Sequence, residues 1–167
     1  ALSAVNPLVG NGTWVLVSGT GNIQLPDQAV TALTNLGVGK NTFRWTVVNG
    51  SCVTSDEVQI TRYLPPSPAD AGPDQSICSS TSQLNAAAIN VGNGNWSLIS
   101  GSGTLTNAGS RTSAVTGLAY GANVFRWTVS SGACPANNDE VTIFRQTEPG
   151  PALVAADTAI CAATIQI

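Results

Sequence analysis

Short runs in which hydrophobic and polar residues alternate are the main pattern along this chain. The clearest run covers residues 123–130, where Phe125, Trp127 and Val129 alternate with Arg126 and Thr128. A period of two places the first group on one face of a strand and the second group on the other. Turn-forming Gly, Asn, Ser and Pro residues separate these runs, and no stretch has the 3.6-residue period of a long helix. The pattern therefore predicts an all-β protein.

The runs belong to an internal repeat. Gly10–Leu16 recurs as Gly92–Leu98, and Asn41–Val47 recurs as Asn123–Val129, in both cases 82 residues further along the chain. One inserted residue then changes the offset to 83, which aligns Cys78 with Cys161. Two copies of one module are present, and a third copy begins near the end of the sequence.

Each module is predicted to be a small sandwich of strands. In the central copy we predict six strands and a short seventh near Gly103–Leu105; the six are Gln75–Ser80, Gln83–Ala88, Gly94–Ile99, Thr112–Thr116, Asn123–Ser130 and Glu140–Arg145. This number of short strands in about 83 residues is typical of two packed antiparallel sheets. The fold class is therefore all-β, with tandem immunoglobulin-like β-sandwich modules that have a period of 82–83 residues.

The repeat also sets the domain boundaries. We expect module 1 at 1–64 without its first strand, a complete module 2 at 65–147, and a linker with the first strand of a third module at 148–167. The last segment either begins another module of a longer array or acts as a donor strand for a neighbouring subunit. The residues expected to take part in strand exchange are Ile160, Cys161, Ile165 and Ile167.

Aromatic residues at inward positions supply the predicted core. The six residues are Trp14, Phe43, Trp45, Trp96, Phe125 and Trp127, which occupy equivalent places in the two modules. A surface platform of Trp rings for sugar stacking is the alternative. The regular alternation favours the core, because a platform residue would break it.

The four cysteines occupy two equivalent positions. Cys78 and Cys161 fall in the first strand of a module, and Cys52 and Cys134 fall between its last two strands. In a sandwich of this type that connection lies at the same end as the start of the first strand, so we expect Cys78 to bond Cys134 within module 2. Cys52 and Cys161 then bond a neighbouring module or subunit. Pairing of each connection with the first strand of the following module, free thiols and zinc are the other options, and no CxxC spacing supports zinc.

Composition excludes many kinds of chemistry. Only 9% of the residues are charged, and the chain has no His, so a Ser–His triad and most zinc sites are unavailable. A net charge of −3 gives no basic surface for nucleic acid, and no apolar run is long enough for membrane insertion. The N-terminus lacks the pattern of a signal peptide. We expect no catalytic residues, no metal site and no cofactor. Structural disulfides would indicate an oxidising, extracytoplasmic location.

A few polar positions remain as candidate sites. Asp56-Glu57 and Asp139-Glu140 are adjacent carboxylates, but neighbours on a strand point to opposite faces, which does not suit a glycosidase pair. Asp70 and Asp74 could bind calcium at the module junction. Arg44 and Arg126 recur on the outward face of the Trp strand, where cross-strand pairing or ligand contact is expected. Tyr63 and Tyr120 are the aromatic residues left for stacking against surface glycans.

The ordered motifs resemble a known module type. They are Ala71–Cys78, the Gly-Asn-Gly-x-Trp run, Phe125–Val129, Gly132-x-Cys134 and Asp139–Val141. This combination resembles the immunoglobulin-like, or PKD-like, tandem repeats of large Bacteroidetes surface proteins, including gliding-motility-associated adhesins. The resemblance implies export by type IX secretion and a stalk or fibre role at the cell surface. The Asp-Phe-Gly-Asp-Gly-like signature of true PKD domains and a C-terminal sorting domain are absent from these residues.

Two functions follow as expectations. The first is a structural module of an extracellular fibre or adhesin stalk, whose partners are copies of itself or adjacent modules of the same long chain. The second is a carbohydrate-binding accessory module of a secreted enzyme, which requires exposed aromatic rings. Tyr63 and Tyr120 fall at different positions in the repeat, which weakens the second expectation.

Overall fold

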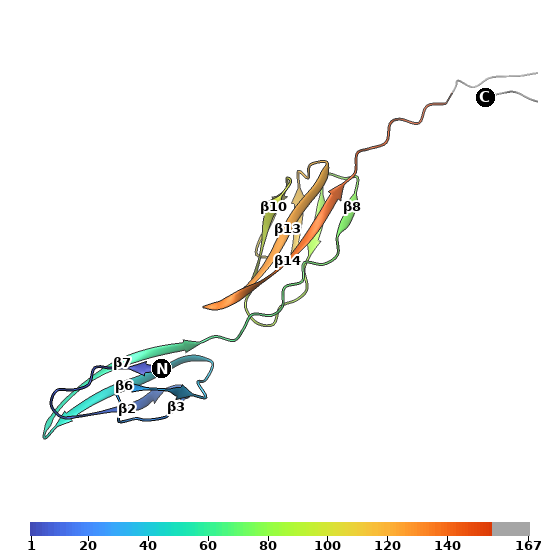
Figure 1. Ribbon diagram of the computed structural model, residues 1–167. Coiled ribbons are helices and arrows are strands. Elements are labelled where there is room, and N and C mark those ends of the chain that lie inside the picture. Colours follow the sequence, from blue (N-terminus) through green and yellow to red (C-terminus); the bar gives the residue numbers. More distant parts are fainter. Residues whose placement is uncertain (155–167) are drawn as a thin grey trace, which may run out of the picture.

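The computed structural model describes residues 1–154, and strands are the regular elements of this part of the chain. Two β-modules follow each other end to end (Figure 1). Strands β1 to β7 form module 1, and strands β8 to β14 form module 2. The prediction of an all-β protein built from tandem immunoglobulin-like sandwiches is confirmed.

Module 2 has two facing sheets. Its strands are β8 (Gln75–Ile77), β9 (Ser82–Asn85), β10 (Asn93–Ser100), β11 (Thr104–Leu105), β12 (Thr112–Thr116), β13 (Gly121–Ser131) and β14 (Cys134–Arg145). The first sheet has the order β10-β13-β14-β8, and the second has the order β11-β12-β9. Every pair is antiparallel except β8 and β14, which are parallel. This arrangement encloses one hydrophobic core between the sheets.

Module 1 repeats this plan without a counterpart of β8. Its strands are β1 (Leu2–Ser3), β2 (Asn11–Ser18), β3 (Asn22–Ile23), β4 (Val30–Thr31), β5 (Leu33–Thr34), β6 (Gly39–Asn49) and β7 (Cys52–Arg62). The larger sheet has the order β2-β6-β7, and the ladders β1-β4 and β3-β5 face it. At an offset of 82, β4 and β5 together correspond to the single strand β12. Within residues 1–154, both modules therefore contain seven strands, although β8 has no counterpart in module 1.

The six aromatic residues predicted for the core are buried. Their exposed fractions range from 0% for Phe43 and Phe125 to 8% for Trp45. The two indoles of each module lie directly opposite each other on neighbouring strands, with ring centroids 5.2 Å apart for Trp14 and Trp45 and 5.0 Å apart for Trp96 and Trp127. Trp127 lies so close to Gly94 that a Cβ added there would be 2.0 Å from the ring, so this position requires glycine.

A buried asparagine fixes the start of the central strand in each module. Asn123 is fully buried, and its Nδ2 donates to the carbonyls of Ala119, Gly121 and Ile143 at 2.9, 3.1 and 3.2 Å. Its Oδ1 accepts from the backbone N–H groups of Ser102 and Ala119. Asn41 makes the same kind of network in module 1. Both residues belong to the repeated motif, but no sequence signal indicated that each one joins a turn to the last two strands of its own module.

The last hairpin of module 2 is longer than predicted. The alternation predicts a final strand at Glu140–Arg145, whereas β14 begins at Cys134 and pairs with β13 through a two-residue turn at 132–133. The first residues of β14 lie mostly exposed beyond the sandwich, so they carry no hydrophobic period. Cys134 and Cys52 therefore begin strands rather than lying in a longer connection. Gly132 has a φ of 51°, which suits a tight hairpin turn.

Candidate functional site

The outer edge of β7 is the most distinctive surface of module 1. In module 2 the equivalent edge of β14 pairs with β8, from Ile143↔Gln75 to Arg145↔Ile77. Within residues 1–154, no strand pairs with the outer edge of β7. An unpaired edge exposes backbone N–H and C=O groups that can pair with another strand. This edge is therefore the first candidate for an interaction site.

The segment that leads into β8 closes module 2 through backbone contacts as well as packing. The N–H of Ala71 donates to Asp139 Oδ2 at 2.7 Å, and the Ala71 side chain is buried. Asp74 Oδ1 accepts from the N–H of Thr142 at 2.7 Å. After the paired residues, the N–H of Gln146 donates to the carbonyl of Ile77 at 2.7 Å. Residues 71–77 thus act as a cover for one side of the sandwich.

Module 1 has counterparts of the β14 residues that residues 71–77 cover in module 2, but no segment covers them within residues 1–154. Val141 is 0% exposed, whereas its counterpart Val58 is 38% exposed. Ile143 is likewise fully buried, but its counterpart Ile60 is only partly buried. An open groove runs beside this edge, lined by residues that include Ser3, Val5, Trp14, Trp45, Asp56 and Val58. This groove in module 1 lies at the position that residues 71–77 fill in module 2.

We call residues 71–77 the covering segment, and the sequence contains a related segment after module 2. At the offset of 83, residues 148–161 correspond to residues 65–78, and Asp157, Ile160 and Cys161 match Asp74, Ile77 and Cys78. The predicted strand-exchange residues Ile160, Cys161, Ile165 and Ile167 lie outside the described residues. Their expected role remains a prediction from the repeat.

The predicted Cys78–Cys134 disulfide is wrong. Both residues are free cysteines, and they lie at opposite ends of module 2. Cys78 follows β8 beside Arg145, whose Nε donates to the Cys78 carbonyl at 3.3 Å. Cys134 begins β14, and eleven residue steps separate it from Arg145 along one continuous strand, about 36 Å at the usual rise. A disulfide needs Cα atoms within about 7 Å.

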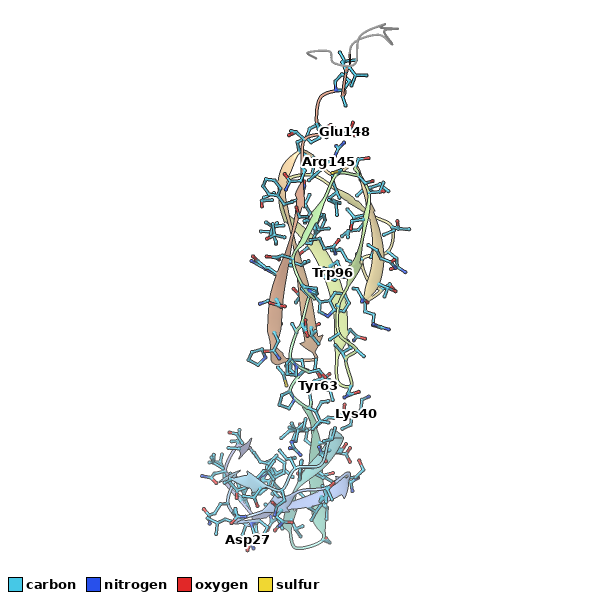
Figure 2. All side chains as sticks on the ribbon, turned by 90° about the vertical axis from the view of Figure 1, so that its right-hand side faces the viewer. Asp27, Lys40, Tyr63, Trp96, Arg145 and Glu148 are labelled. Carbon is cyan, nitrogen blue, oxygen red and sulfur yellow. The ribbon has the colours of Figure 1, made fainter. Side chains whose placement is uncertain are left out.

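The error came from the expected place of Cys78 near the start of the first strand. Figure 2 places Arg145 and Tyr63 at opposite ends of module 2. Because β8 runs parallel to β14, Cys78 lies at the Arg145 end. The β13–β14 turn lies at the Tyr63 end instead, since Cys134 Sγ is 3.8 Å from the Tyr63 carbonyl oxygen. The parallel pairing directs the starts of β8 and β14 toward the Tyr63 end, as expected, but β8 pairs only with Ile143–Arg145 at the far end of the long β14, and Cys78 follows the end of β8.

The β13–β14 turn also forms the junction between the modules. The Tyr63 ring lies over Gly132, where an added Cβ would come within 2.3 Å of the ring. Asn137 Nδ2 donates to the carbonyls of Pro66 and Ser67 at 3.2 and 3.1 Å. These contacts join the linker to the following module, so the hairpin turn of one module packs on the end of the module before it.

The polar candidates have structural partners. Arg44 and Arg126 each form an exposed ion pair, with Glu57 and Glu140 respectively, at 2.6 Å in both modules. Asp70 Oδ1 accepts from the N–H of Gly72. Asp74 and Asp139 hold the covering segment as described above. Within residues 1–154, no group of three or more His, Cys, Asp or Glu residues is placed to hold a metal ion. The same part of the chain has no helix that is long and apolar enough to cross a membrane.

The two tyrosines do not form a common platform. Tyr63 lies against Gly132 at the module junction. Tyr120 lies under the Arg145 guanidinium, with Cζ 4.0 Å from the ring centroid, at the other end of module 2. One face of each ring is thus occupied by a neighbour from its own chain. Extended stacking against a glycan requires several free ring faces on one surface.

Comparisons with known proteins complete this description. No protein-family model matches the chain, and no curated protein matches it. Among solved structures, the chain is similar to the PKD domain from KIAA 1837 protein, with 28% identity over 52% of this chain and 92% of that domain and a TM-score of 0.45. It is similar to the Clostridium thermocellum CbhA fibronectin(III)-like modules, with 12% identity over 90% of this chain and 88% of that chain and a TM-score of 0.43. It is also similar to domains 4–9 of the surface layer protein SbsC, with 17% identity over 89% of this chain and 24% of that chain and a TM-score of 0.37. The assignment of immunoglobulin-like modules rests on the strand order described above.

Proposed function

We propose that this chain is a structural repeat unit of an extracellular fibre or adhesin stalk and that it assembles end to end by exchange of a β-strand. The observation that carries the proposal is the open edge of β7, where Val58 is 38% exposed and its enclosed counterpart Val141 is 0% exposed. Residues 148–161 of a second copy align with residues 65–78, which include the segment that closes this edge in module 2, and have Asp157, Ile160 and Cys161 at the positions of Asp74, Ile77 and Cys78. Addition of such a strand supplies backbone hydrogen bonds and fills the groove with apolar side chains.

The contacts of module 2 define how the incoming strand would dock. In module 2, Asp74 accepts from Thr142, Ile77 lies beside Arg145, and Ala71 donates to Asp139. In the same register, Asp157 of the incoming strand would accept from the N–H of Gln59, Ile160 would lie beside Arg62, and the N–H of Val154 would donate to Asp56. The strand then enters module 1 at the end that faces away from module 2. Each copy would add to the next in a single direction, which gives a head-to-tail filament.

A proline in the outer edge of β7 tests the proposal. In module 2 the N–H groups of Thr142 and Gln146 face the covering segment, so by the period of two the N–H groups of Gln59, Thr61 and Tyr63 face outward in module 1. Thr61→Pro removes one of these donors and leaves the bonds to β6 intact, which an edge strand tolerates. Thr61→Ala keeps the donor and is the matched control.

The readout is assembly of the full chain. We expect wild-type and Thr61→Ala chains to form long oligomers by light scattering and electron microscopy. Thr61→Pro is expected to lower the fraction assembled at least tenfold while its circular dichroism spectrum stays that of the wild type. A synthetic peptide of residues 148–164 is expected to block growth by occupying β7. Equal assembly of Thr61→Pro and Thr61→Ala would contradict strand exchange. Native material of very high mass that persists after reduction would indicate one continuous chain of many modules instead.

A further inference from the structure

The cysteines lie at the two ends of the modules and not in their cores. Cys78 and Cys52 are exposed, and Cys134 is partly exposed. Cys78 lies at the end of module 2 from which the chain continues, beside Arg145. Cys134 lies at the opposite end, against module 1, with its Sγ 3.8 Å from the Tyr63 carbonyl oxygen. Cys134 therefore lies at the junction between the two modules, and Cys52 and Cys78 lie at module ends.

The register of module 2 shows which residue would lie beside Tyr63 when module 1 is completed. Tyr63 and Gln146 are equivalent at the offset of 83. The N–H of Gln146 bonds the carbonyl of Ile77, and the next residue of that segment is Cys78. A covering segment in module 1 thus brings its own cysteine to Tyr63. Neighbouring strands are about 4.8 Å apart, so this cysteine lies next to Cys134, which already contacts Tyr63.

The other end of each copy has the matching arrangement. Cys52 begins β7 after the β6–β7 turn, as Cys134 begins β14 after the β13–β14 turn. In the contact between modules 1 and 2, the turn of the following module packs on the end of the preceding one. If module 1 of a second copy follows module 2 in the same way, its Cys52 lies against Gln146 and therefore beside Cys78.

We propose that two disulfides join each pair of successive copies: Cys161 of one copy with Cys134 of the next, and Cys78 of the first with Cys52 of the next. This inference rests on the proposed function, because it needs the exchanged strand. Both bonds cross from one chain to the other, and every cysteine of an inner copy is used. In the same register, Cys161 of the exchanged strand would lie at the far end of β7 from Cys52, so these two cysteines do not pair with each other in this arrangement.

The chemistry is an ordinary thiol–disulfide exchange. Two cysteine thiols lose two protons and two electrons and form one S–S bond. A small disulfide such as oxidised glutathione accepts the two electrons and leaves as two thiols. This reaction is favourable in an oxidising, extracytoplasmic compartment. Cys78 and Cys134 of one copy lie at opposite ends of module 2, well beyond the roughly 7 Å that a disulfide requires, so they do not bond each other before docking.

Peptide mapping of assembled full-length chains tests this pairing. Filaments grown with oxidised glutathione from a mixture of ¹⁵N-labelled and unlabelled chains are digested without reductant. We expect two cross-linked peptides, Cys134–Cys161 and Cys52–Cys78, and about half of each is expected to be isotopically mixed. Denaturing electrophoresis without reductant should give a ladder in steps of 16.9 kDa that collapses to one band on reduction. A Cys78–Cys134 peptide, or linked peptides without isotopic mixing, would overturn the proposal.

Serine variants separate this inference from strand exchange itself. Cys134→Ser leaves one bond for each junction, so the ladder is expected to persist. The double variant Cys52→Ser with Cys134→Ser removes both bonds, so it should assemble into filaments that dissociate fully to monomers in detergent without reductant. If wild-type filaments also dissociate fully in that detergent, the disulfides are absent although strand exchange holds. If neither chain assembles, the proposed function fails, and the disulfide proposal fails with it.

Discussion

Modules 1 and 2 have closely similar sequences, yet one is closed and the other is open. The same Trp pair, buried Asn and exposed Arg–Glu pair are present in both. Within residues 1–154, only module 2 has a first strand of this kind, β8, with the segment leading into it, and its last two core positions, Val141 and Ile143, are fully buried. Their counterparts in module 1 remain exposed or partly exposed. The comparison shows that the sheets and the Trp pair form without the covering segment, while enclosure of the core requires it.

The largest expected difference between the modules comes from the glycine under each Trp ring. Gly94→Ala places a methyl group where Trp127 lies, and the enclosed core gives the ring no room to move. We expect it to lower the free energy of unfolding of module 2 by about 3 kcal/mol. Gly12→Ala makes the same clash with Trp45, but that ring borders the open groove and can shift, so about 1 kcal/mol is expected in module 1.

Urea unfolding followed by Trp fluorescence measures both changes, because each module has its own Trp pair. The control is Gly117→Ala, since an added Cβ at Gly117 meets no atom within 4 Å. Its φ of 72° adds a local backbone cost, but no displacement of a ring. Equal losses for Gly94→Ala and Gly12→Ala would contradict the view that module 1 is open at this side.

Removal of the buried asparagine is expected to have the next largest effect. Asn123→Ala leaves several buried backbone groups of the turn without their partner, and we expect a loss of about 3 kcal/mol in module 2. Asn41→Ala is expected to cost about 2 kcal/mol in module 1, where the bond to the Ile60 carbonyl is longer, at 3.4 Å. Calorimetry of the two variants gives the comparison. Loss of less than about 0.5 kcal/mol in both cases would exclude a structural role for these networks.

The valine under the covering segment measures enclosure directly. Val141→Ala should cost about 2 kcal/mol, because the side chain is 0% exposed. Val58→Ala should cost less than about 0.5 kcal/mol, because 38% of that residue is exposed. When the peptide of residues 148–164 is bound, the cost at Val58 should rise toward that at Val141. No change on addition of the peptide would indicate that it does not occupy the groove.

The smallest difference is expected at the surface ion pairs. Arg126→Ala and Arg44→Ala each remove one exposed pair with a carboxylate, and each should cost about 0.5 kcal/mol. The two modules should respond alike, because the two pairs have the same 2.6 Å distance and nearly the same exposure. High salt should reduce both effects. A clearly larger cost in one module would show that its pair has a further role.

Much of the fold could be predicted from hydrophobic alternation and the repeat. The inward positions of Trp96 and Trp127 follow from a period of two, and the strand at 112–116 was predicted with its observed bounds. The length of β14 could not be predicted, because its first residues extend beyond the sandwich and are exposed on both faces. The alternation of hydrophobic and polar residues reflects burial of one face of a strand, so it gives no signal where a strand lies outside the core.

The candidate site could be predicted only in part. The missing first strand of module 1 followed from the phase of the repeat, and the open edge of β7 is its structural counterpart. The cysteine pairing failed, because β14 is longer than the alternation predicts and β8 pairs only with its last residues, which leaves Cys78 and Cys134 at opposite ends of the module. The roles of Asp74 and Asp139 as partners of backbone N–H groups were also missed. Short polar side chains give no periodic signal for such contacts.

The parallel pairing of β8 and β14 also determines how module 2 would bear a pulling force. The chain enters the module near Tyr63 and leaves it near Arg145, at opposite ends (Figure 2). Tension along the long axis therefore pulls β8 back toward module 1 and β14 away from it. Because the two strands lie side by side in the same direction, their hydrogen bonds are loaded together in shear and do not open one after another. A completed module 1 would have the same geometry, so a chain of such modules would resist extension at every joint between a first and a last strand.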